Sequence, residues 1–305
     1  KALTPTGEEA NESRRYQLIQ NSKDFETFLQ ALQKIEFFSF DTETTAADPM
    51  SADLVGMSFA WKPCESYYIP VSSSKHNGQG IPLETAMKKL RPILEDSKRA
   101  KAGQNIKYDW IVMRRHDVDL RGVVFDTMIA SYLIAPLKLN HNLDDISFEF
   151  LGVRKITTES LLGNGKEKLA SMAEVPLERI SEYACEDADC VFRLVPLLKA
   201  KMEDQGLTEL FETLELPLFE VLARMEMNGV KLDLKFLAGL SEKMAEDLDG
   251  LSRQIYREAG TEFNINSTKQ LAEVLFVQMK LPVIRRTKTG YSTDVNVLEK
   301  LAESH

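Results

Sequence analysis

The chain has 305 residues, 43% of them hydrophobic and 28% charged, with a formal net charge of −9. This length accommodates two domains of ordinary size, and no apolar run approaches the length of a membrane-spanning helix. Three cysteines without a C-x-x-C pair indicate neither a disulfide framework nor a zinc site, and a polar N-terminal segment gives no sign of a signal peptide, so we expect a cytoplasmic protein.

The first third of the chain predicts a mixed sheet. After a polar tail or linker over 1–16, a helix over 22–34 is expected, capped by Asn21 or Ser22 and apolar along one face. Strands over 35–41, 54–61 and 66–70, joined by short proline-containing turns, predict an antiparallel meander.

Short strands then alternate with helices, which favours an α/β fold with a mixed sheet flanked by helices. The expected elements are a loop over 76–80, a helix over 83–94 that is interrupted or kinked near Pro92, a strand over 100–103, a helix over 106–116 capped by Asn105, a strand over 122–125, and a helix over 127–134 capped by Asp126.

The chain after residue 143 is almost entirely helical in pattern. A long helix over 207–228 should kink or split at Pro217 and end at Asn228-Gly229. Helices over 234–259, capped by Asp233, and over 271–279, preceded by a capping box at 267–270, should follow. The basic segment 285–290 is either a solvated flexible loop or a contact for DNA phosphates.

Two carboxylates end the first apolar strand. Asp41 and Glu43 are spaced i, i+2, so they face the same side of a strand. At about 4 Å, like charges repel by roughly 4 kcal/mol at an effective dielectric near 20, and a shared cation would turn that cost into binding. An isolated pair of this kind is more often a solvated strand end, so a functional interpretation needs further ligands.

Two later helices each place one acid in an apolar stripe, Asp109 in the first and Asp187 in the second. A charge in such a stripe is costly unless it is paired or binds a metal, although a first-turn acid is also favoured by the helix dipole. Tyr183 lies one turn before Asp187, where its hydroxyl can reach a water near that acid. Glu186 is the rival ligand, and Asp189 should face away.

Four acids on three elements would be severely destabilising if they converged without metal. Hard oxygen ligands suit Mg²⁺ or Mn²⁺, and a pair of such ions about 3.5–4 Å apart serves in-line phosphoryl displacement. Convergence of these acids is therefore the central prediction.

The motifs D-x-E at Asp41–Glu43, N-x-x-x-D at Asn105–Asp109 and Y-x-x-x-D at Tyr183–Asp187 resemble those of the DEDD exonuclease superfamily. Glu182 stands where the histidine subtype has its histidine, so the tyrosine subtype is favoured. Beyond these motifs, the chain from about residue 17 resembles the family A bacterial DNA polymerases of the DNA polymerase I, Klenow-fragment type, in the segments 54–60, 124–128, 186–189, 224–233 and 263–271.

The resemblance implies a ribonuclease H-like sheet domain over 17–205 and an incomplete, all-α polymerase thumb over 206–305, with no palm or fingers. It also implies a 3′-5′ exonuclease that removes nucleotides from DNA 3′ ends by two-metal hydrolysis. The alternatives are a ribonuclease D-like RNA exonuclease and a catalytically degenerate DNA-binding domain.

Roles for individual residues follow from the same resemblance. Asp41, Glu43 and Asp187 would hold a first Mg²⁺ or Mn²⁺ that activates the attacking water, and Asp41 and Asp109 a second that stabilises the leaving 3′-oxygen. Tyr183, with an ordinary pKa near 10, would orient the nucleophile rather than act as the base. Contacts to the last nucleotides are implied for Thr42, Gln104, Asn105 and Tyr108.

At Ala46-Ala47 this sequence departs from the family, which often has a larger apolar residue there. The departure puts in doubt whether a side chain at this place stacks on the base at the 3′ end. The implied partners are single-stranded DNA 3′ ends at the exonuclease site and duplex DNA at a complete thumb, and we expect a monomer. The four histidines, His76, His116, His141 and His305, are scattered and are interpreted as ordinary surface or core residues.

Overall fold

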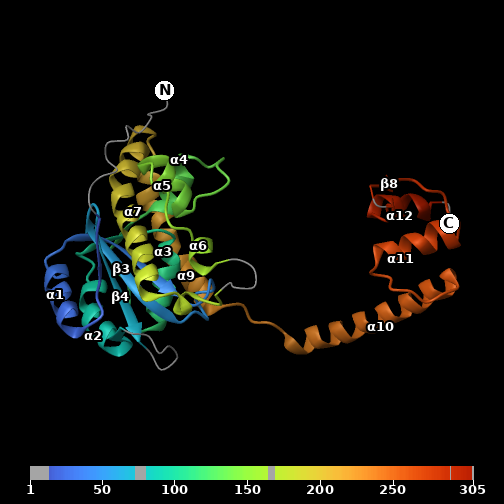
Figure 1. Cartoon of the computed structure of the whole chain (residues 1–305), viewed down its shortest axis with the longest axis horizontal. Coiled ribbons are helices and arrows are strands. Elements are labelled where there is room, and N and C mark those ends of the chain that lie inside the picture. The colour runs from blue at the N-terminus through green and yellow to red at the C-terminus, as the bar shows by residue number, and fades with distance from the viewer. Residues whose placement is uncertain (1–13, 73–79, 164–168, 289, 304–305) are drawn as a thin grey trace. The chain divides into compact units, whose positions relative to one another are not determined.

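The computed structural model describes residues 14–72, 80–163, 169–288 and 290–303. The chain forms two compact units that divide between Gly229 and Val230 (Figure 1). Of the sequence predictions, the first 13 residues of the tail, His76 to Gln79 of the expected loop, Thr289 and His305 lie outside the described residues.

The described part of the first unit contains a mixed seven-stranded sheet in the order β1-β4-β3-β2-β6-β7, with β5 paired to β4. Strands β2, β3 and β4 form the predicted antiparallel meander, and β6 and β7 join β2 in parallel. The strands are β1 (Arg15–Leu18), β2 (Phe37–Thr44), β3 (Leu54–Lys62), β4 (Glu65–Ser72), β5 (Ile81–Pro82), β6 (Ala100–Gly103) and β7 (Val123–Asp126). The predicted α/β fold with a mixed sheet is confirmed.

Strand β1 corrects the sequence analysis, which placed residues 15 and 16 in the tail. Arg15 and Tyr16 pair in parallel with Glu65 and Ser66 of β4. The four residues of β1 alternate polar and apolar side chains, but a run this short is a weak signal, and its partner lies 50 residues away.

Helices cover both faces of this sheet (Figure 1). On one side α1 packs on the meander through Phe28, whose ring lies 5.2 Å from that of Phe59; on the other side α7 runs across the strands. The helices of the first unit are α1 (Ser22–Leu32), α2 (Leu83–Leu94), α3 (Ile106–Arg115), α4 (Thr127–Ile134), α5 (Leu143–Leu151), α6 (Thr158–Leu162), the 3₁₀ turn η3 (Met172–Glu174) and α7 (Leu177–Asp204).

The segment around Pro217 belongs to the first unit, which ends at Gly229, 24 residues beyond the boundary expected at residue 205. It divides as predicted, into α8 (Thr208–Leu210), the π-helical turn η4 (Phe211–Glu215) and α9 (Leu216–Asn228). Pro217 lies in the first turn of α9, and the backbone stays helical through the junction with η4. Arg224 of α9 lies over the Trp110 ring of α3, 5.3 Å from its centroid. These contacts join α9 to the sheet domain.

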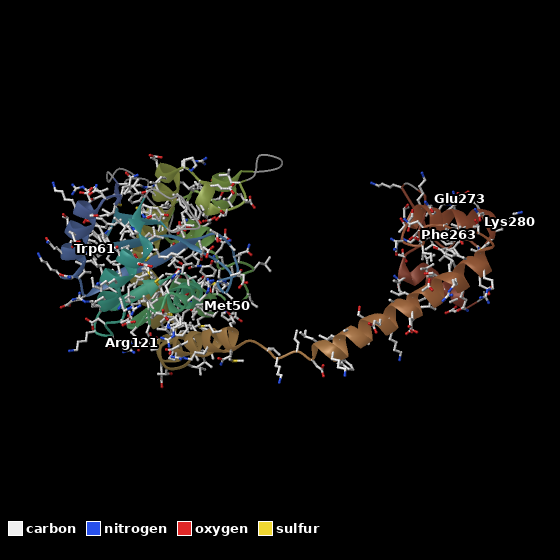
Figure 2. All side chains as sticks on the ribbon, turned by 90° about the horizontal axis from the view of Figure 1, so that it is seen from below. Met50, Trp61, Arg121, Phe263, Glu273 and Lys280 are labelled. Atoms are coloured by element: carbon white, nitrogen blue, oxygen red, sulfur yellow. The ribbon has the colours of Figure 1, made fainter. Side chains whose placement is uncertain are left out.

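The second unit is mainly helical, with α10 (Leu234–Ala259), α11 (Thr268–Ala272), the π-helical η5 (Glu273–Gln278) and α12 (Val295–Ala302). Asp233 and Ser267 cap α10 and α11 as predicted. The capping box is incomplete, because Gln270 accepts a hydrogen bond from the Asn264 backbone N–H instead of reaching back to Ser267. In Figure 2, Phe263 lies among the apolar side chains of this unit and Lys280 points outward.

The basic segment is not a simple loop. Its described residues form a short antiparallel pair, β8 (Arg286–Thr287) with β9 (Gly290–Tyr291). Arg285 pairs with Asp294 at 3.3 Å, and the guanidinium of Arg286 lies 5.3 Å from the centroid of the Tyr291 ring. Arg285 and Arg286, two of the basic residues interpreted as possible phosphate contacts, thus already have partners within the protein.

Candidate active site

The acidic end of β2 lies where the sheet becomes open on one side. Only Phe37 to Ser39 pair with β6, whereas β3 accompanies β2 up to Thr44. The strand beyond Ser39 is therefore free to meet α3 on its β6 side. Glu43 is buried and Asp41 half-buried, and the Oε1 atom of Glu43 has no hydrogen-bond partner. A buried carboxylate oxygen without a hydrogen-bond partner is rare in a folded protein, and a cation could coordinate it.

Asp109 reaches β2 from the first turn of α3 and is almost fully buried. Its Oδ1 accepts hydrogen bonds from the backbone N–H of Thr42 at 2.9 Å and from the Thr42 hydroxyl at 2.6 Å. Because the Thr42 N–H lies beyond the pairing with β6, Asp109 supplies the acceptor that a neighbouring strand would otherwise provide. The acid of the second motif is thereby fixed against the first.

The start of α3 differs from the sequence prediction. Asn105 occupies the N-cap position, but it adopts a left-handed conformation with φ 54° and its side chain makes no capping bond. Asp126, at the end of β7, provides the cap: its Oδ2 accepts the N–H of Ile106 at 2.8 Å, and its Oδ1 accepts that of Met128 at 2.8 Å. One buried carboxylate thus begins both α3 and α4, as the sequence predicted for α4 alone.

The third acid is carried by α7, which a buried hydroxyl holds against β2. The Oγ atom of Ser39 donates to the carbonyl of Ala188 at 2.7 Å, one residue beyond Asp187. Ser39 is two residues before Asp41, so the same contact sets the separation of the first and third motifs. Tyr183 lies one helical turn before Asp187, and its hydroxyl is 3.0 Å from Oγ1 of Thr158.

These carboxylates act on one another electrostatically. Burial raises the pKa of Asp41 well above its ordinary value, and the charges of Asp109, Glu43 and Asp187 raise it further. Burial and then Asp187 raise the pKa of Glu43. Burial raises the pKa of Asp109 to about 7, although the hydrogen bonds from Thr42 oppose the shift. Acids from three elements therefore share one poorly solvated site, as the sequence analysis required.

Lys155, which the sequence analysis did not single out, contributes a positive charge to this site. Its Nζ forms an ion pair with Oδ1 of Asp187 and lies 3.4 Å from Oδ1 of Asp144. Burial raises the pKa of Asp187 to about 6, and Lys155 keeps it from rising further. The segment 153–157 has no regular structure and no periodic pattern, so the sequence offered no signal for this contact.

The described residues include no group of three or more His, Cys, Asp or Glu side chains arranged to hold a metal ion. The chemistry of the site nonetheless fits divalent cations. The acids supply hard oxygen donors, one Glu43 oxygen has no partner, and an ammonium already lies against Asp187.

The rival acids have other partners. Glu186 accepts hydrogen bonds from Arg14 and from the Ile156 N–H, both at 2.7 Å. Asp189 faces β1 and the β3–β4 turn, where it accepts the N–H of Cys64 at 2.6 Å and the hydroxyl of Tyr16 at 3.2 Å. Both carboxylates hold neighbouring segments of the fold and do not join the cluster at Asp41.

Three of the side chains expected to contact nucleotides bond within the protein. Thr42 donates to Asp109. The Gln104 amide donates to the carbonyl of His141 at 2.8 Å. The Tyr108 hydroxyl contacts Thr44 and the carbonyl of Ala46, which ties α3 to the chain that follows β2. In this structure these residues position the acids and the adjoining loop.

The pKa of Tyr183 differs from the ordinary value assumed from the sequence. Burial and then Asp187 raise the pKa of the phenol, so it stays neutral throughout the physiological range. The hydroxyl can donate or accept a hydrogen bond but cannot serve as a base near neutrality.

Comparisons with known proteins relate the two units to different families. A 3′-5′ exonuclease family model matches residues 16–203, and a DNA polymerase family A model matches residues 234–305. Exonucleases of the first family use divalent metal ions. DNA polymerase I of Pseudomonas aeruginosa is 37% identical over 296 residues, covering 94% of this chain and 32% of that protein. DNA polymerase I of Rhizobium leguminosarum is 38% identical over 285 residues, covering 87% of this chain and 28% of that protein.

The chain thus spans about a third of the length of these curated relatives. Among solved structures, the POL domain of Pol1 from M. smegmatis, in complex with DNA primer-template and dNTP, has a TM-score of 0.67 at 24% identity and covers 94% of this chain and 45% of that one. At that identity the likeness shows the fold. Among the described helices, none has both the length and the apolar content needed to cross a bilayer.

Proposed function

Because this chain belongs to the 3′-5′ exonuclease family, we propose that it hydrolyses the terminal phosphodiester of a DNA 3′ end as the proofreading part of a DNA polymerase I. The observation that carries the proposal is the convergence of Asp41, Glu43, Asp109 and Asp187 in a buried site, where the charges of Asp109 and Asp187 raise the pKa of both Asp41 and Glu43. A cluster of this kind costs stability unless it binds cations, so the fold retains it for a function.

We propose Mg²⁺ or Mn²⁺ as the cofactor, with two ions. Asp41, Glu43 and Asp187 would hold one ion, and Asp41 and Asp109 the other. When bound, such ions lower the pKa of the attacking water and stabilise negative charge on the leaving oxygen. The reaction joins a water oxygen to phosphorus, breaks the bond to the 3′-oxygen of the preceding nucleotide, and returns a proton to that oxygen, which releases a mononucleotide.

The chain's own groups prepare the site for this step. Thr42 holds Asp109 by two hydrogen bonds, so this carboxylate keeps one orientation. The neutral Tyr183 hydroxyl lies one helical turn from Asp187 and can orient a water by hydrogen bonding after it leaves Thr158. Proposed contacts to the terminal nucleotides remain those of Thr42, Gln104, Asn105 and Tyr108.

A DNA substrate is favoured over RNA because residues 234–305 match family A DNA polymerases. We propose that residues 17–205 carry the exonuclease and that residues 206–305 begin the polymerase thumb, with α9 at the start of the second segment packed on α3 of the first. We also propose that the protein is a cytoplasmic monomer that binds single-stranded DNA 3′ ends.

The test is cleavage of a 5′-labelled single strand with Mg²⁺ or Mn²⁺. The unmodified chain should shorten DNA from its 3′ end and release mononucleotides, and a matched RNA strand should be cut more slowly. Asp41→Ala and Asp187→Ala should abolish cleavage while keeping the circular dichroism spectrum of the parent. Glu182→Ala, an exposed acid on α7, is the matched control and should retain activity. Metal-dependent cleavage by either Asp variant would refute the assignment.

A further inference from the structure

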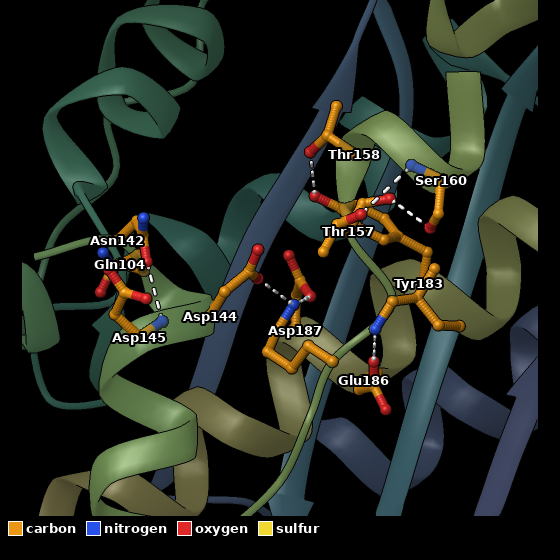
Figure 3. A network of polar contacts seen from close by, with 12 residues as sticks. Gln104, Asn142, Asp144, Asp145, Thr157, Thr158, Ser160, Tyr183, Glu186 and Asp187 are labelled. Atoms are coloured by element: carbon orange, nitrogen blue, oxygen red, sulfur yellow. Dashed lines mark hydrogen bonds and ion pairs between the residues drawn. The ribbon is translucent and has the colours of Figure 1, made fainter. Parts of the chain in front are cut away.

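The side chain of Lys155 is only 1% exposed, and it comes from the irregular segment between α5 and α6. Its ammonium lies between two carboxylates, Asp187 of α7 and Asp144 of α5. Figure 3 shows these two acids turned toward each other. The ammonium also lies 5.2 Å from the centroid of the Tyr183 ring, over its face. A buried lysine is rare unless it is paired, and this one pairs with an acid of the proposed metal site.

The segment that carries Lys155 is docked on α7 by two residues that follow it. Ile156 donates its N–H to Glu186 at 2.7 Å, and Thr158 meets the Tyr183 hydroxyl at 3.0 Å (Figure 3). Lys155 therefore projects from an anchored segment, and its position is set by the same helix that carries Asp187. This arrangement differs from a long surface side chain that happens to meet an acid.

The charge of Lys155 extends over the rest of the cluster. It lowers the pKa of Asp41 and of Glu43 as well as that of Asp187, opposing the upward shifts caused by burial and by the neighbouring acids. The three residues on which it acts are those proposed to hold the first ion. The Glu43 oxygen without a partner shows that one ammonium satisfies the cluster only in part.

We propose that Lys155 is an internal counter-ion that takes the place of a divalent cation at Asp187, holds the acids together in the metal-free chain, and competes with the first ion for them. This proposal rests on the proposed function, since it requires Asp41, Glu43 and Asp187 to be metal ligands. Lys155 is then a positioning residue. Loading of the first ion requires the ammonium to leave Oδ1 of Asp187 and pair with Asp144 alone.

The test is calorimetric titration of the metal-free chain with Mn²⁺ alone, for the unmodified protein, Lys155→Met and Lys138→Met. Lys138 forms an ion pair with Glu149 at 2.6 Å at the protein surface. Lys138→Met is therefore the control, because it also removes one paired lysine but lies outside the acidic cluster. Removal of the competing charge should tighten Mn²⁺ binding by Lys155→Met at least about tenfold, because a unit charge a few ångströms from a divalent ion repels it strongly. Lys138→Met should bind like the parent.

A second measurement does not depend on affinity. In EDTA, Lys155→Met should melt at a lower temperature than the parent because its acids lack a counter-ion, and saturating Mn²⁺ should remove that difference. Lys155→Gln keeps a hydrogen-bond donor without the charge, and its melting temperature in EDTA should also be lower than that of the parent. This variant replaces Lys155→Met in the test if the Met variant does not fold in EDTA.

The outcomes separate the two proposals. Equal Mn²⁺ dissociation constants for the parent and both Lys155 variants would overturn the counter-ion role and leave the exonuclease assignment standing. Mn²⁺ binding that is the same in the parent and in Asp41→Ala would overturn the proposed metal site, and the counter-ion role that depends on it would fall as well. Failure of both the parent and the Lys155 variants to bind Mn²⁺ would overturn both.

Discussion

Replacement of Asp109 by Asn should stabilise the metal-free protein while it abolishes cleavage, and the gain should grow with pH. The side chain is 2% exposed, and burial raises its pKa from 3.8 to about 7. Because the folded pKa lies above the unfolded one, the stabilisation from protonated Asp109 is fully present below about pH 4 and is lost as the pH rises through 7. The amide side chain of the Asp109→Asn variant carries no charge at any of these pH values.

The expected size follows from the rise of the Asp109 pKa from 3.8 to about 7. At about 1.36 kcal/mol per unit, ionisation of Asp109 costs the folded state about 4 kcal/mol by pH 8, relative to pH 4. The Asn carbonyl can still accept both hydrogen bonds that Thr42 donates to Asp109, so the variant keeps the local geometry. Its free energy of unfolding should therefore match the parent near pH 4 and exceed it by up to about 4 kcal/mol at pH 8.

The assay is urea denaturation in EDTA at pH 5 and pH 8, followed by circular dichroism. Glu182→Gln, an exposed change on α7, provides the control and should differ from the parent by the same small amount at both pH values. A stability difference between Asp109→Asn and the parent that does not grow with pH would show that the Asp109 carboxylate is not held in a costly, charged state. The pKa argument for the whole cluster would then fail.

Two further changes test how the fold positions the site. Asp126→Ala removes the acceptor for the first N–H groups of both α3 and α4, and it should lower the free energy of unfolding by about 3 kcal/mol or more and reduce cleavage, measured by denaturation and nucleotide release. Gly56→Ala places a Cβ 2.2 Å from the hydroxyl of the buried Tyr68 and should cost about 1–3 kcal/mol in the same assay. Gly239→Ala in α10 meets nothing within 4 Å, and it should leave the transition of the first unit unchanged.

The sequence predicted elements whose signals are local. Asn21 caps α1, Asp233 caps α10, and Asp126 caps α4, because an Asx side chain meets the backbone two or three residues ahead wherever the chain turns into a helix. The placement of Asp41 and Glu43 at the end of β2 follows from the strand period and the apolar run before them. No tertiary information was needed for these positions.

Features that depend on distant partners were not predictable in the same way. Asn105 has the residue type of an N-cap, but the tight junction between β6 and α3 puts it at φ 54° and gives its role to Asp126, 21 residues later. Lys155 lies in a segment without a periodic pattern, and the acid that it contacts, Asp187, is 32 residues later in the chain. In each case a local pattern gave either the wrong partner or none, because the contact exists only after the sheet and helices have assembled.

The unfavourable charge of the site requires anchors that do not depend on metal. Ser39 holds α7 to β2, Thr42 holds Asp109, and Asp126 fixes the start of α3. Each of these contacts is a buried hydrogen bond made by a carboxylate or beside one, and none of them involves a metal ion. Repulsion among the acids can therefore lower the stability of the metal-free fold without moving the elements that carry them, so an arriving cation meets ligands that already face one another.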